Sequence, residues 1–172
     1  ISKKTVIDEN SIAPIIVNER LYYISINSED MITSLISKNI DGSNRTKIMS
    51  RNQEEGWIHH IKSNGNIIYI FTVHKDKNQQ DYTICSKYDV LTNEMVDLFQ
   101  TKGIIDSPIV NKSCITWWNP NDTLNRTHTK YSLYDIESNS MIDYQDSVIM
   151  LSNNGILWTK FNKNEADIPK GE

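Results

Sequence analysis

The segment Asn66-Ile67-Ile68-Tyr69-Ile70 decides the fold, because variants of it recur along the chain at a nearly constant spacing. Four segments align without gaps: Arg20-Leu21-Tyr22-Tyr23-Ile24, Asn66-Ile67-Ile68-Tyr69-Ile70, Ser113-Cys114-Ile115-Thr116-Trp117 and Gly155-Ile156-Leu157-Trp158-Thr159. Their fourth positions are separated by 46, 47 and 42 residues. A fixed period of about 20 to 50 residues is typical of stacked repeat architectures. The chain is therefore expected to be a repeat protein.

Each unit can be divided into four β-rich runs separated by Gly, Asn, Asp and Ser, the residues that tolerate tight turns. The predicted strands lie near 11–17, 20–27, 32–40 and 45–50; near 56–63, 66–75, 81–90 and 95–100; near 106–111, 113–118, 127–136 and 141–145; and, in an incomplete last unit, near 147–152 and 155–161. The pair Asn64-Gly65 is the strongest hairpin signal, because both residues accept the positive φ of a type I′ turn. Residues 3–7 are predicted as a strand of a neighbouring or closing blade.

Composition and patterning favour an all-β propeller. Alanine, the best helix former, occurs only at Ala13 and Ala166, whereas Ile, Val, Thr and Tyr are plentiful. The second strands alternate weakly, as in the continuous apolar run 67–71, so both of their faces are expected to be covered. Stacked blades provide such cover, and a β-sandwich is the alternative.

We predict one propeller-like domain over 1–172, partial or four-bladed. Its blades are expected at about 11–50, 56–100, 104–145 and, incomplete, 147–161.

One stretch resembles a known family. Ile40-Asp41-Gly42-Ser43-Asn44-Arg45-Thr46-Lys47-Ile48 is similar to the end of a class B repeat of the low-density-lipoprotein receptor family, whose propeller blades carry a YWTD signature, and Leu157-Trp158-Thr159 resembles part of that signature. No unit has the Asp of the signature. The same pattern resembles that of related bacterial propeller domains of unknown function, and the Asn-, Ile- and Lys-rich composition is similar to that encoded by AT-rich genomes, so the resemblance favours this bacterial branch. The resemblance implies a propeller and a binding habit, without naming a ligand.

Charge and hydropathy limit the classes of partner that the sequence favours. The formal net charge is −4, so nothing favours nucleic acid or an anionic membrane surface. The longest apolar stretch, 12–17, contains Pro14 and is far shorter than the roughly 20 residues that span a bilayer. The chain does not begin with Met and resembles an excised piece, so we expect an extracellular or cell-surface bacterial protein whose signal or anchor lies outside this piece.

Cysteine and histidine do not indicate a cofactor. Cys85 and Cys114 lie in different repeats without CxxC spacing, and two half-buried free thiols are favoured over a disulfide. His59 and His60 are neighbours on one predicted strand and should point to opposite faces. His74 and His128 lie in different units, so no metal site and no cofactor are predicted.

The common signatures of catalysis are missing from the sequence. It contains no Gly-x-Ser-x-Gly elbow, HExxH, phosphate loop or Gly-x-Gly-x-x-Gly. A pair of acids from separate blades could still flank a sugar, because that arrangement is purely spatial. The enzyme question stays open, with the sequence favouring a protein that is not an enzyme and indicating no catalytic residue.

The candidate ligand-binding residues are Trp57, His59, Trp118 and Asp122. Trp57 begins the first strand of its unit. Trp117 and Trp118 should face opposite ways, so that one is in the core and the other lies beside the loop containing Asp122. An exposed ring there would be a recognition anchor, whereas packing in the core or between blades is the alternative for each Trp.

These observations favour a non-enzymatic binding or scaffold module that recognises a protein or carbohydrate through propeller loops. The alternatives are an accessory propeller of a hydrolase and the sensory ectodomain of a membrane-anchored bacterial regulator. Three and a half blades leave strand edges and blade faces open. Further blades of a longer parent chain, a closing strand or a second copy are expected to cover them.

Overall fold

The computed structural model describes residues 10–119, 130–145, 147–152 and 155–160, and all regular secondary structure in these ranges is β-strand. The first sheet consists of β1 (Ser11–Val17), β2 (Arg20–Asn27), β3 (Ile32–Asn39) and β4 (Thr46–Arg51), and the second of β5 (Trp57–Asn64), β6 (Ile67–Lys75), β7 (Asp81–Asp89) and β8 (Met95–Lys102). The third consists of β9 (Asp106–Val110), β10 (Cys114–Asn119), β11 (Lys130–Asp135) and β12 (Ser140–Gln145), and the last pair is β13 (Ser147–Ser152) and β14 (Gly155–Lys160).

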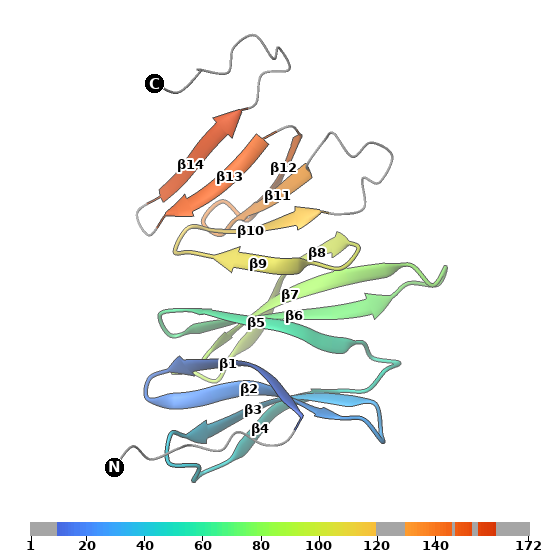
Figure 1. Cartoon of the computed structure of the whole chain (residues 1–172), viewed down its shortest axis with the longest axis vertical. Coiled ribbons are helices and arrows are strands. Elements are labelled where there is room, and N and C mark those ends of the chain that lie inside the picture. Colours follow the sequence, from blue (N-terminus) through green and yellow to red (C-terminus); the bar gives the residue numbers. More distant parts are fainter. Residues whose placement is uncertain (1–9, 120–129, 146, 153–154, 161–172) are drawn as a thin grey trace, which may run out of the picture. The chain divides into compact units, whose positions relative to one another are not determined.

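Within each sheet the strands are antiparallel and neighbours in space follow the order of the chain (Figure 1). The predicted four-stranded antiparallel repeat is thus confirmed, and the observed strands follow the predicted ranges closely. The strand predicted at 3–7 lies outside the described residues.

The chain divides into two compact units, residues 1–104 and 105–172, which are described separately. Unit 1 contains the sheets β1–β4 and β5–β8, and unit 2 contains β9–β12 and β13–β14. The prediction of one continuous domain stays a prediction.

The core of unit 1 lies between its two sheets. Apolar side chains of the first sheet, including Tyr22, Ile24 and Leu35, pack with Ile61 and Ile70 of the second in one buried cluster. Along β6 every side chain from 68 to 73 is buried, which confirms that both faces of this strand are covered. At about 25 cal/mol for each Å² of apolar surface removed from water, such burial is the main stabilisation of the stack.

The first strand of each four-stranded sheet carries a β-bulge at a corresponding position. The register shifts between Ile12 and Ile15 in β1, between Ile58 and His60 in β5, and opposite Thr116 and Trp118 in β9. An X-Pro dipeptide marks two of the bulges, Ala13-Pro14 and Ser107-Pro108, and both residues before Pro have positive φ.

The bulge in β5 corrects the prediction for His59 and His60. Their ring centroids are 4.4 Å apart in an edge-to-face arrangement, so the two side chains do not point to opposite faces. The extra residue of a bulge interrupts the two-residue alternation on which that prediction depended.

The hairpin between β5 and β6 also differs from the prediction. Asn64 pairs with Ile67, so the turn residues are Gly65 and Asn66. Only Gly65, with φ 58°, has positive φ, which is the φ pattern of a type II′ turn. The turn at Asn18 and Glu19, with φ 48° and 60°, has the two positive angles of a type I′ turn.

The turn after the third strand repeats the same contacts in the second and third sheets. The Tyr88 hydroxyl donates to Asn93 Oδ1 at 2.7 Å, and the Tyr134 hydroxyl likewise donates to Asn139 Oδ1. Both Asn residues have positive φ, 60° and 53°. In the first sheet, the Asp41 carboxylate accepts from the backbone N–H of Ser43, as expected for an Asp at the start of a turn.

Both cysteines are free and fully buried, rather than half-buried as expected. Burial, together with the Asp97 carboxylate, raises the pKa of Cys85 strongly, and burial also raises the pKa of Cys114. In the described part of the chain, no helix has the length and hydropathy needed to cross a membrane.

Candidate functional site

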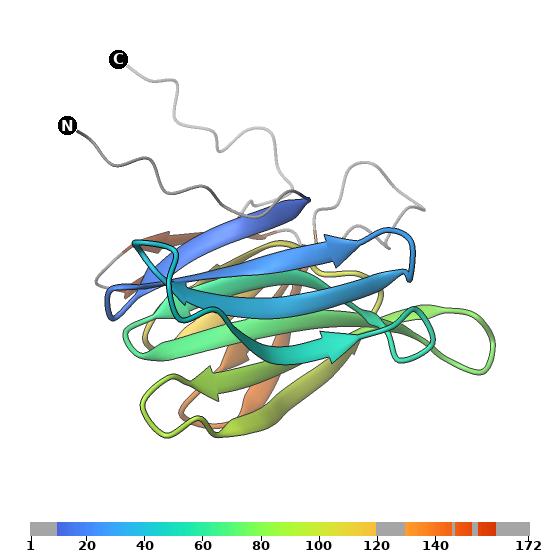
Figure 2. The same ribbon diagram turned by 90° about the horizontal axis from the view of Figure 1, so that it is seen from below.

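A groove of about 410 Å³ lies at one end of the strands of unit 1. It is lined by Ile26, Asn27, Ser28, Met31, Ile32, Thr33, Gln53 and Trp57. These residues come from the β2–β3 hairpin, the β4–β5 loop and the start of β5. Figure 2 shows both connections at the end of unit 1 that also carries the β6–β7 hairpin. The volume is within the range of about 300–1,000 Å³ that is typical of ligand pockets.

Two features fix the start of β5 and therefore the position of Trp57. The backbone N–H of Ile58 donates to Thr33 Oγ1 at 2.8 Å, which ties the start of β5 to β3. Gly56 has φ 92°, and a Cβ atom at this position would lie 2.5 Å from the Val73 carbonyl oxygen and 2.6 Å from His74 Nδ1. Only glycine fits both the angle and the close approach. The sequence Gly56-Trp57 therefore brings a half-buried indole to the groove.

The two loops beside the groove are built by the same local device, an Asn followed at the second and third positions by acidic residues. Asn27 Oδ1 accepts from the backbone N–H of Glu29 at 3.0 Å. Asn52 Oδ1 accepts from the N–H groups of Glu54 and Glu55 at 3.0 and 2.9 Å. Such Asx turns order a loop without a regular strand or helix.

Behind Gly56 lies the His74 imidazole, which stacks on Tyr82 with ring centroids 5.2 Å apart. Its Nε2 is 3.0 Å from Thr72 Oγ1. Burial lowers the pKa of His74, and the positive charge of Arg51 lowers it further, against a smaller opposing effect of Asp97. Burial and the charge of Arg51 therefore favour the neutral form of the His74 imidazole behind the β4–β5 loop.

The lining of the groove is suited to binding rather than to acid–base chemistry. Its eight residues include no carboxylate, histidine, cysteine or lysine. The Thr33 hydroxyl already accepts the Ile58 N–H. The Asn27 amide is engaged within its own loop, since its Nδ2 also donates to Asp30 Oδ2 at 2.7 Å. The Gln53 amide and the Ser28 hydroxyl can form hydrogen bonds but do not titrate near neutral pH.

Of the four residues chosen from the sequence, the structure describes Trp57, His59 and Trp118. Trp57 lines the groove, whereas His59 is half-buried beside His60 on β5 and is not among the lining residues. Trp118 is on β10 in unit 2 and is 44% exposed, while Trp117 is buried, which confirms their predicted alternation. Asp122 lies outside the described residues.

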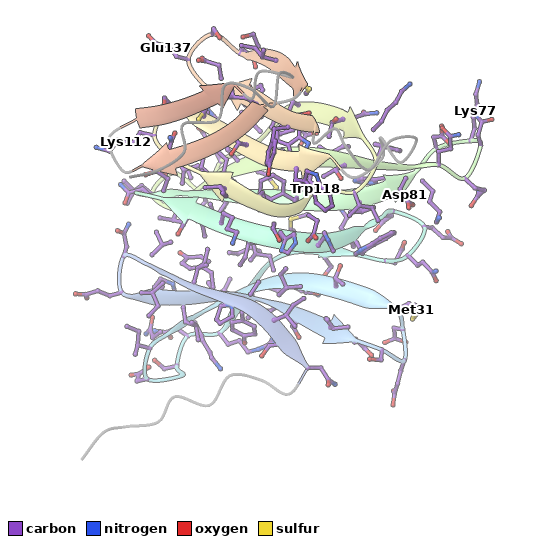
Figure 3. The ribbon with its side chains drawn as sticks, turned by 45° about the horizontal axis from the view of Figure 1, so that its top comes forward. Met31, Lys77, Asp81, Lys112, Trp118 and Glu137 are labelled. Carbon is purple, nitrogen blue, oxygen red and sulfur yellow. The ribbon has the colours of Figure 1, made fainter. Side chains whose placement is uncertain are left out.

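Sequence reasoning missed Met31 and Gln53, which share the groove with Trp57. Figure 3 shows Met31 at the tip of the β2–β3 hairpin, where its side chain is 54% exposed. One signal could have found this region: the pattern Asn-x-acid-acid occurs at 27–30 and again at 52–55, in two connections that the repeat places at one end of the strands.

No protein-family model matches the chain, and no curated protein sequence matches it. A solved structure that it resembles is the β-propeller domain of the Trilobed protease from Pyrococcus furiosus, described as having an open velcro topology. The TM-score is 0.56 at 13% sequence identity, and the match covers 92% of this chain and 51% of that chain.

This likeness concerns the fold alone. Together with the four-stranded antiparallel sheets, it confirms the predicted class: the chain folds as blades of a β-propeller. The chain spans about half the length of the propeller domain that it resembles.

Proposed function

We propose that this chain is a non-enzymatic binding module that recognises a protein or carbohydrate through the loops at one end of its blades. The observation that carries the proposal is the groove beside Trp57, which combines a partly exposed apolar lining with the Gln53 amide and the Ser28 hydroxyl. Ligand sites are typically concave and apolar with a few polar groups that orient the ligand. Trp is also the side chain most often found to dominate binding energy.

The test compares the wild-type protein with Trp57→Ala on glycan and peptide arrays. We expect at least one ligand class to bind the wild type and to bind Trp57→Ala about 30-fold more weakly, the effect of losing about 2 kcal/mol at a binding hot spot. Trp118→Ala is the matched control, because it removes an indole in unit 2. Binding that survives Trp57→Ala but is lost in Trp118→Ala would assign recognition to the other Trp.

A second variant separates lost binding from lost folding. Met31 has φ 53° and an exposed side chain, so Met31→Asn keeps a residue that tolerates this backbone and removes only groove surface. It should fold like the wild type by circular dichroism and bind more weakly. Arrays on which no ligand depends on Trp57 or Met31 would contradict the proposal.

The second candidate function is an accessory propeller of a hydrolase. The observation that favours it is the resemblance to the propeller domain of a protease. In this case the parent open reading frame would encode a catalytic domain beside the blades, and sequencing it decides between a propeller with and without such a domain.

We further propose that the repeats are of the YWTD type and that the protein is bacterial and extracellular or at the cell surface. The resemblance of 40–48 to a class B repeat supports the proposal that the repeats are of the YWTD type.

We also propose that further blades or a second copy complete the stack. Light scattering after size-exclusion chromatography tests the second copy, since a strictly monomeric mass dismisses it.

A further inference from the structure

The apolar part of the groove consists of two branched side chains, one flexible side chain and one indole. Ile26 and Ile32 flank the β2–β3 hairpin, Met31 lies at its tip, and Trp57 comes from the second sheet. Met is unbranched and adapts to irregular apolar shapes. Because three of the four apolar side chains are not aromatic, the lining fits a bulky apolar side chain better than a sugar ring, which is usually held by flat aromatic faces together with several converging polar groups.

The two loops beside the groove carry four carboxylates: Glu29 and Asp30 in the first loop, and Glu54 and Glu55 in the second. All four residues are exposed, and neither loop, 27–32 or 52–57, contains Lys or Arg. The Asx turns described above hold the backbone of both loops, so the acidic residues are placed on ordered backbone.

Among the described residues, no Lys or Arg forms an ion pair with these four carboxylates. Arg51, at the end of β4, lies close enough to His74 to lower the pKa of that imidazole. Lys75 forms an ion pair with Asp81 at 3.2 Å. Lys77 is on the β6–β7 hairpin, which contributes no residue to the groove (Figure 3). Within the part of the chain that the structure describes, the apolar groove is thus flanked by four carboxylates without an ion-pair partner.

We propose that the groove binds a peptide segment in which a bulky apolar side chain is flanked by Lys or Arg residues. The apolar side chain fills the space between Met31 and Trp57, and the flanking cations face the carboxylates of the two loops. Complementary charge around an apolar centre mainly determines partner choice and association rate. This inference names the ligand class and rests on the proposed function of the same groove.

The test is an NMR titration of the full chain with defined peptides. The basic probe is an acetylated, amidated peptide Gly-Lys-Lys-Leu-Lys-Lys-Gly; a second peptide has Glu in place of Lys, and a third has Ser in place of Leu. The chain has four Trp residues, and the Trp57 indole N–H signal is assigned by its loss in Trp57→Phe. We expect the basic Leu peptide to shift this signal. The other two peptides should bind at least about tenfold more weakly than the basic Leu peptide.

Charge neutralisation localises the effect. Glu29→Gln combined with Glu54→Gln, one acid from each loop, should weaken the basic peptide about three- to tenfold, as expected for two exposed charge pairs. The matched control is Glu19→Gln combined with Glu94→Gln. It changes the net charge of unit 1 by the same amount, but at the end of the strands that is away from the groove. The control should bind like the wild type, and raising NaCl from about 0.05 M to about 0.5 M should remove most of the difference.

The outcomes separate this inference from the proposed function. Equal binding of the basic and acidic peptides, or binding of the basic peptide without a shift of the Trp57 signal, overturns the inference. If neutral oligosaccharides shift the Trp57 signal and the peptides do not, the groove is a carbohydrate site: the proposed function stands and the inference is wrong. If neither class shifts this signal, both are wrong.

Discussion

At the scale of single residues, Gly56 shows how one position places the indole that lines the groove. Residues other than glycine fit neither its φ of 92° nor its close contact with β6, and Trp57 follows it directly. Gly42 has a similar φ of 90°, but a Cβ atom there would have no atom within 4 Å. Comparing the same substitution at the two glycines therefore separates the cost of backbone strain from the cost of a steric clash.

We predict that Gly42→Ala lowers the free energy of unfolding by about 1–2 kcal/mol, the usual cost of a left-handed conformation for an L-residue. Gly56→Ala should cost about 1–3 kcal/mol more, because the added methyl group meets backbone at 2.5 Å. Urea unfolding followed by circular dichroism measures both. Equal losses in the two variants would show that the β4–β5 loop moves away without cost.

His74 makes stability depend on pH with a defined sign. The pKa of His74 is lowered in the folded state from the ordinary value of 6.5. As pH falls from 6.5 toward the folded pKa, the unfolded chain therefore binds more protons at this residue than the folded chain does. The contribution of His74 to stability is therefore fully present above 6.5 and is lost below it. Other groups titrate as well, which requires a difference measurement.

We predict that the free energy of unfolding of the wild type falls more steeply than that of His74→Gln between about pH 7 and about pH 5. Urea midpoints of the two proteins across this range provide the measurement. Parallel pH profiles would mean that the imidazole keeps its ordinary pKa beside Arg51.

At the scale of elements, the turn after the third strand is the most regular part of the repeat. The Tyr88 ring belongs to the core cluster, and its hydroxyl reaches Asn93, whose φ of 60° closes the turn between β7 and β8. The third sheet repeats this with Tyr134 and Asn139. A side-chain bond from the core thus supports each turn.

We predict that Tyr88→Phe lowers the free energy of unfolding by about 1 kcal/mol, the usual net value of one hydrogen bond. Asn93→Gly keeps the positive φ and removes the acceptor, so the double variant should lose little more than the larger of the two single losses. Urea unfolding of the three variants measures this coupling. Fully additive losses would contradict the contact.

At the scale of the whole molecule, the two cysteines report on cooperativity. Cys85 belongs to unit 1 and Cys114 to unit 2, and both thiols are fully buried with raised pKa. A buried thiol with a raised pKa reacts slowly with disulfide reagents, because the reactive species is the exposed thiolate. Each thiol therefore reports the opening of its own unit.

We predict that neither thiol reacts in the native protein with an aromatic disulfide reagent, and that both become reactive over one urea transition, as expected for a single domain. Cys114→Ala reports on Cys85 alone, and Cys85→Ala on Cys114 alone. Different urea midpoints for the two variants would show that the units unfold independently and that the single-domain prediction is wrong.

The strand order and the turn at Asn18-Glu19 could be predicted from the sequence because they depend on local chemistry, whereas the turn between β5 and β6 lies one residue later than predicted. The repeat spacing, the β-branched runs and turns such as Asn18-Glu19 involve residues close along the chain. The alternation of Trp117 and Trp118 follows from strand geometry in the same way.

Only the tertiary structure decided the groove beside Trp57 and the orientation of His59. The bulge in β5 depends on pairing with β6 and interrupts the alternation that the sequence implied for His59 and His60. The groove joins Met31 to Trp57 through the bond from Ile58 N–H to Thr33, two residues that are 25 positions apart. The sequence by itself determined the blades, because their turns and alternation are local; how one blade meets the next depends on packing between distant residues, which no local pattern encodes.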